Sequence, residues 1–153
     1  MLPTDTNSVA FTIDEVTHTI RFARDLDASP ERVFDAWTQP DQLANWWDAM
    51  GDRLAICEMD LRPGGAFRFV SRHHPDKPFT GTYLEISPPA RLVFDANGAT
   101  GTVLLDEESA GTRMRVEIAC SSADHLAQFV AMGVADGTGK TLNNLEKYLE
   151  ANG

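Results

Sequence analysis

The sequence contains little cysteine, little positive charge and no long hydrophobic run. Its two cysteines, Cys57 and Cys120, stand far apart and neither belongs to a C-x-x-C pair, which excludes zinc-ribbon and dithiol redox motifs. Only 13 basic residues accompany 23 acidic ones, and the net charge of −10 disfavours binding to nucleic acids and to anionic membrane surfaces. No run of about 18 or more apolar residues occurs, so we expect no transmembrane helix.

The first residues also lack a basic segment followed by an apolar block, which is the pattern of a secretory signal peptide. We therefore expect a cytoplasmic protein whose two cysteines are reduced. The chain has 153 residues, of which 42% are hydrophobic, and shows no linker, internal repeat or low-complexity tract. These features predict a single globular domain over residues 1–153.

Motifs for common catalytic chemistry are missing as well. There is no H-E-x-x-H or H-x-x-x-H spacing, and the neighbours His73 and His74 are poorly placed to bind one ion together, so no metal or other cofactor is expected. There is no G-x-S-x-G nucleophile motif. Residues 137–141 read Gly-Thr-Gly-Lys-Thr, but they lack the full phosphate-loop spacing and stand inside a helical pattern.

The strongest periodic pattern lies at the C-terminal end. Apolar residues recur about every 3.6 positions over residues 123–149, which predicts one long helix, about 40 Å long if it is unbroken. Gly133 and Gly137 share one face of this helix. They favour close packing of the helix against a sheet, with a kink or room for a ligand as the alternatives.

The chain ahead of this helix consists mainly of short alternating segments. Ser29-Pro30-Glu31 is a strong start signal for a short helix, and a second short helix is expected from about Asp41. The order of elements predicts an α+β fold with an antiparallel meander. The predicted strands cover residues 17–27, 53–61, 66–72, 79–86, 91–95, 100–105 and 112–119, and Val9 to Ile13 indicate a further short strand.

This order resembles the helix-grip fold of the START and birch-pollen-allergen-like superfamily. Local motifs are similar to its branch of homologues of the activator of the ninety-kilodalton heat-shock chaperone ATPase; they lie at residues 28–37, 43–47, 60–65, 81–86 and 88–94. The resemblance extends over about residues 17–149. It implies a curved sheet of six or seven strands around the long C-terminal helix, and a cavity between them that often binds an apolar small molecule. One departure is Gly137-Thr138, where such sequences commonly read Gly-Trp.

A cavity of that kind would be lined by inward strand positions and by the first half of the long helix. Pockets of this type are mostly apolar, although simple core filling is the alternative for each residue. We expect the ligand-binding residues to be Trp37, Trp47, Phe69, Phe67, Phe94, Met114, Phe129 and Met132.

Binding of an apolar small molecule is therefore the first functional hypothesis, with no catalytic residue assigned. One alternative is an enzyme of the polyketide-cyclase or dehydratase type that uses the same cavity, with His125 or a buried acid as proton carrier. Another is a chaperone partner that acts through its surface. The sequence leaves a homodimer open.

Overall fold

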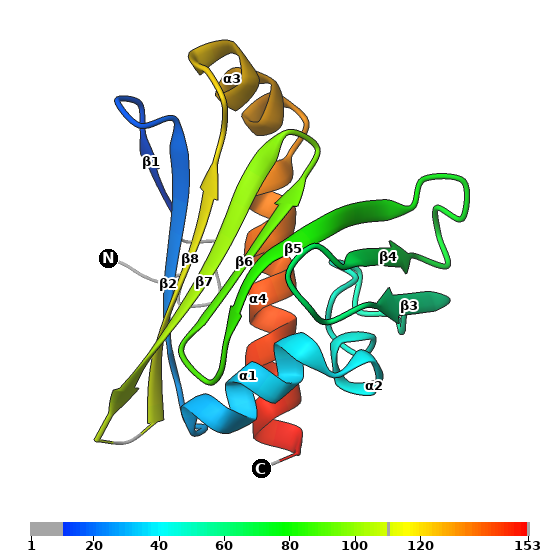
Figure 1. Ribbon diagram of the computed structural model, residues 1–153, viewed down its shortest axis with the longest axis vertical. Coiled ribbons are helices and arrows are strands. Elements are labelled where there is room, and N and C mark those ends of the chain that lie inside the picture. Colours follow the sequence, from blue (N-terminus) through cyan, green and yellow to red (C-terminus); the bar gives the residue numbers. More distant parts are fainter. Residues whose placement is uncertain (1–10, 110, 153) are drawn as a thin grey trace, which may run out of the picture.

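The computed structural model describes residues 11–109 and 111–152, which form eight strands and four helices (Figure 1). The strands are β1 (Thr12–Asp14), β2 (Thr19–Leu26), β3 (Ile56–Met59), β4 (Ala66–Val70), β5 (Phe79–Ser87), β6 (Arg91–Ala96), β7 (Ala99–Glu108) and β8 (Gly111–Ala119). The helices are α1 (Pro30–Thr38), α2 (Pro40–Leu43), α3 (Ala123–Ala131) and α4 (Val134–Ala151). None of the described helices is long and apolar enough to cross a membrane.

All eight strands belong to one antiparallel sheet in the order β1-β2-β8-β7-β6-β5-β4-β3. Strands β3 to β8 form the expected meander, and β2 pairs with β8, so that Thr19 stands opposite Ala119. The α+β prediction is confirmed. The strand count exceeds the expected six or seven because β1 adds an edge strand, while Val9 lies outside the described residues.

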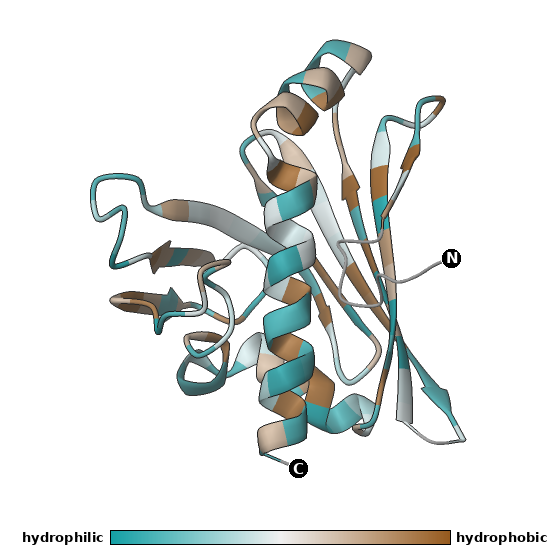
Figure 2. Ribbon diagram, turned by 180° about the vertical axis from the view of Figure 1, so that it is seen from behind, coloured by the Kyte–Doolittle hydropathy of each residue, from teal (hydrophilic) through white to brown (hydrophobic). Residues whose placement is uncertain are grey.

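Helix α4 crosses one face of the curved sheet, as the opposite views in Figures 1 and 2 show. Helices α1 and α2 lie near one end of α4, and α3 lies at the other end. Helix α1 begins after Ser29, whose side-chain oxygen accepts a hydrogen bond from the Arg32 N–H. It ends before Pro40, because the residue preceding a proline is driven out of the helical region, and Gln39 is extended.

The segment predicted as one long C-terminal helix forms two helices, and the break falls at Gly133, one of the two glycines at which a kink was the alternative. Helix α3 ends at Ala131, and α4 starts after Gly133, which has a left-handed backbone with φ of +83°. That conformation strains a residue with a Cβ atom, so glycine fits this position. The break changes the direction of α3 relative to α4. Phe129 and Met132, which lie just before the break, line the cavity described below.

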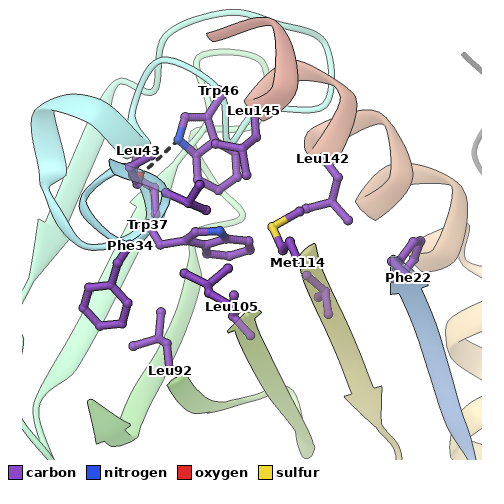
Figure 3. Close-up of a cluster of buried hydrophobic side chains, with 14 of the residues drawn as sticks. Phe22, Phe34, Trp37, Leu43, Trp46, Leu92, Leu105, Met114, Leu142 and Leu145 are labelled. Atoms are coloured by element: carbon purple, nitrogen blue, oxygen red, sulfur yellow. Dashed lines mark hydrogen bonds between the residues drawn. The ribbon is translucent and has the colours of Figure 1, made fainter. Parts of the chain in front are cut away.

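The core lies where α1, α2 and α4 meet the sheet (Figure 3). Trp46 is fully buried there, and its indole N–H donates to the Ala36 carbonyl at 3.1 Å. The ring of Trp37 meets the ring of Trp46 edge-on, with 4.8 Å between their centroids. Leu142 and Leu145 of α4 pack against the same cluster, so this end of the molecule has a closed apolar interior.

Candidate functional site

A cavity of about 540 Å³ lies between the first half of α4 and the sheet and is partly open to solvent. Apolar side chains make up most of its lining. Six of the eight residues expected from the sequence lie in this lining: Trp37, Trp47, Phe69, Phe94, Phe129 and Met132. They come from α1, the loop after α2, two strands and the α3 region, so the fold brings together residues that are far apart in the chain.

The other two expected residues, Phe67 and Met114, lie outside this lining. Met114 is fully buried in the core on β8, while Val116 and Ile118 of the same strand line the cavity. Phe67 is 3% exposed, and its ring stacks on the ring of Phe69 with 5.0 Å between centroids. Phe67 therefore packs beside a lining residue, and Met114 is part of the core.

An aromatic cluster forms one wall of the cavity. The ring of Trp47 lies 5.0 Å from that of Phe69 and 5.4 Å from that of Phe79, and 6.3 Å from that of Trp37, measured between centroids. Aromatic pairs in such tilted arrangements stabilise each other beyond their buried area. The wall is therefore a preformed apolar surface, and it contains two of the three tryptophans of the chain.

Two glycines of the lining have opposite roles. A Cβ atom on Gly101 of β7 would lie 2.6 Å from Cζ of Phe94, so only glycine lets that ring lie across the strand. A Cβ atom on Gly137 of α4 would meet no atom within 4 Å. The expectation of close packing at Gly137 is thus wrong, and the alternative of free space beside the helix is what the structure has.

Sequence reasoning missed the polar part of the lining, which includes Asp48, Ser71, His74, Lys77 and Asn97. His74, Lys77 and Asn97 are exposed and mark the mouth. Asp48 is only 8% exposed, and its carboxylate accepts a hydrogen bond from the Ser71 hydroxyl at 3.2 Å.

Helix α4 holds the segment that carries Asp48. The Thr141 hydroxyl donates to the carbonyl of Trp47 at 3.0 Å, and the Asn144 amide donates to the carbonyl of Asp48 at 2.9 Å. In the sequence, residues 48–52 have the composition of a solvent-exposed loop. No local signal reveals that packing on α4 turns the Asp48 side chain inward.

His125, the residue considered as a proton carrier, lies outside the cavity lining. Its Nδ1 accepts a hydrogen bond from the Ser121 N–H at 3.0 Å, and its ring meets that of Phe129 edge-on. Asp48 is the buried acid in the cavity lining.

The thiols of both cysteines are poor nucleophiles, because burial disfavours their thiolate form. Burial raises the pKa of the Cys57 thiol from 9.0 to about 11, and burial also raises the pKa of the Cys120 thiol. At pH 8 the thiolate fraction of Cys57 is then about a hundredfold lower than that of an ordinary thiol, because each pKa unit is a factor of ten. We expect dithiodipyridine to modify the native protein correspondingly slowly at pH 8, and the urea-unfolded protein rapidly. Equal rates in both states would contradict this prediction.

The curved antiparallel sheet, the helix across its face and the open cavity between them define a helix-grip protein. The chain belongs to the family of activator of Hsp90 ATPase homolog 1-like proteins, whose sequence model matches residues 27–150. This confirms the resemblance found in the sequence.

Solved structures support the same fold. A protein from Nitrosomonas europaea is 23% identical in sequence and superposes with a TM-score of 0.80, covering 93% of this chain and 100% of that chain. An AHSA1-like protein from Aeromonas hydrophila is 27% identical with a TM-score of 0.71, covering 88% and 93%. A comparison with curated protein sequences gave no significant match.

Proposed function

We propose that this protein binds an apolar small molecule in the cavity between α4 and the sheet. The observation that carries the proposal is the cavity of about 540 Å³ with its mainly apolar lining, since small-molecule sites typically enclose about 300 to 1,000 Å³. The free space beside Gly137 supports it, because protein interiors are otherwise close-packed. The proposed binding residues are the six expected ones in the lining, namely Trp37, Trp47, Phe69, Phe94, Phe129 and Met132.

Titration with the neutral apolar dye N-phenyl-1-naphthylamine tests this proposal. We expect saturable binding of one dye per chain and quenching of tryptophan fluorescence, because Trp37 and Trp47 line the cavity. Native mass spectrometry of the freshly purified protein would show whether a ligand co-purifies and give its mass. A dye signal that rises linearly without saturation would contradict a defined site.

His125→Ala serves as the control that separates binding from the enzyme alternative. A binding protein keeps its dye affinity in this variant, because His125 does not line the cavity. An enzyme that used this histidine would lose turnover of its substrate. The position of His125 supports the binding hypothesis, and an enzyme using the cavity would have to rely on Asp48 instead.

The family description suggests a second candidate function, activation of the Hsp90 ATPase. Such a role would act through the protein surface and would not require an occupied cavity. It is tested by adding the purified protein to Hsp90 and measuring ATP hydrolysis; a rate that does not change removes this candidate. We also propose a cytoplasmic location, which the free thiols of Cys57 and Cys120 support.

A further inference from the structure

Three side chains with metal-binding atoms converge beside the cavity, and one of them, Asp48, belongs to its lining. One carboxylate oxygen each of Asp48 and Asp52 and one ring nitrogen of His73 all lie within 4.8 Å of one another. The two acids stand on the loop after α2, and the histidine stands on the loop between β4 and β5. We propose that these three residues bind a divalent transition-metal ion, with Zn²⁺ as the best-fitting ion.

The charges of the cluster favour a cation. Asp48 is 8% exposed and forms no ion pair with any lysine or arginine among the residues that the structure describes. Asp52 contacts His73, which carries a full charge only when it is protonated. Two carboxylates this close repel each other, and a buried carboxylate without a cation costs folding energy. A divalent ion between them would remove both penalties.

Neighbouring hydrogen bonds hold the cluster in place before an ion arrives. The Ser71 hydroxyl donates to Oδ2 of Asp48 at 3.2 Å and accepts the backbone N–H of His73 at 3.1 Å, so it joins the two loops. The Met50 N–H donates to Oδ1 of Asp48 at 3.0 Å. A carboxylate has about four acceptor sites, so both oxygens of Asp48 keep capacity for an ion. Hydrogen bonds from neighbouring groups that do not themselves bind the ion fix the orientation of metal ligands.

The donor set selects the class of ion. An imidazole nitrogen suits Zn²⁺ and its neighbours in the transition series, whereas Mg²⁺ and Ca²⁺ prefer oxygen ligands throughout. Three protein ligands leave a coordination position open, as in zinc sites that bind water or substrate. Asp48 also belongs to the cavity lining, so the open position would be available to water or to an oxygen atom of a molecule in the cavity.

Calorimetric titration of the chelator-treated full chain with ZnCl₂ tests the proposal. We expect one Zn²⁺ per chain, and a loss of affinity of about tenfold or more in Asp52→Asn and in His73→Gln, since each variant removes one ligand. Both residues are exposed, so the variants are expected to fold, which circular dichroism checks. Asp76→Asn and His125→Gln remove the same chemical groups outside the cluster and should leave the affinity unchanged.

Each contrary outcome overturns the proposal. Zn²⁺ binding that is absent, or that is equally strong in Asp52→Asn and His73→Gln, excludes the site. Binding of several Zn²⁺ ions with low affinity, reduced equally in the control variants, would mean non-specific binding to the acidic surface. Ca²⁺ binding that matches Zn²⁺ and ignores His73→Gln would mean a carboxylate site without the histidine. The dye titration is independent of these results, because the ion site does not require an apolar ligand in the cavity.

Discussion

Replacement of Trp46 by alanine is expected to lower the free energy of unfolding by about 3 to 5 kcal/mol, the usual range for removing a large aromatic residue from a core. Trp46 is fully buried, and it packs against Trp37 and Trp47 with centroid distances of 4.8 and 6.0 Å. The variant also leaves the Ala36 carbonyl without its 3.1 Å hydrogen bond. Urea denaturation followed by circular dichroism measures the loss.

Two further variants separate the contributions. Trp46→Phe keeps most of the ring volume and loses the N–H, so we expect a loss of about 1 to 3 kcal/mol from the unpaired carbonyl and the smaller ring. Val16→Ala changes a side chain that is 88% exposed and should stay within about 0.5 kcal/mol of the parent. A loss below about 1 kcal/mol for Trp46→Ala would mean that this part of the core does not pack as described.

The second large effect is expected at Gly137, where leucine should abolish most ligand binding without cost to stability. No atom lies within 4 Å of the position of its Cβ, so a leucine side chain extends into the cavity without a clash at its base. Leucine is also a better helix former than glycine by up to about 1 kcal/mol. We expect dye affinity to fall about tenfold or more in titrations, while the midpoint of urea unfolding stays equal or rises.

Gly137→Ala is the matched control for this experiment. It gains the same helix propensity of about 1 kcal/mol but occupies little of the cavity, so dye affinity should stay within about threefold of the parent. If leucine instead lowered stability by more than about 1 kcal/mol, the glycine would be closely packed, as its sequence context favoured. If leucine left dye affinity intact, the dye would bind elsewhere.

The strands were predictable from the sequence because their two faces differ in polarity. On β8, Met114, Val116 and Ile118 alternate with Arg113, Arg115 and Glu117, and the structure pairs this strand with β2 and β7 as a half-buried element. The same pattern could not separate core from cavity. Alternation gives the face on which a side chain lies, but not whether the opposite helix reaches it, so Met114 and Ile118 were indistinguishable.

Local sequence patterns could not predict the helix break or the polar part of the site. Apolar spacing continues from Phe129 through Val134 across the break, and only the left-handed backbone of Gly133 separates α3 from α4. Asp48 looked like a loop residue, because its burial comes from contacts with α4 that are distant in sequence. The His73–Asp52 contact likewise joins two loops, which no spacing rule for one segment detects.

The pairing of β2 with β8 affects how the chain folds during its synthesis. Since Thr19 stands opposite Ala119, the edge of β2 that faces β8 has no partner until nearly the whole sheet has left the ribosome. Non-local pairing of this kind slows folding, and an unpaired strand edge invites association with other nascent chains. Synthesis of this protein therefore includes a long interval in which this edge of the first long strand stays without its β8 partner.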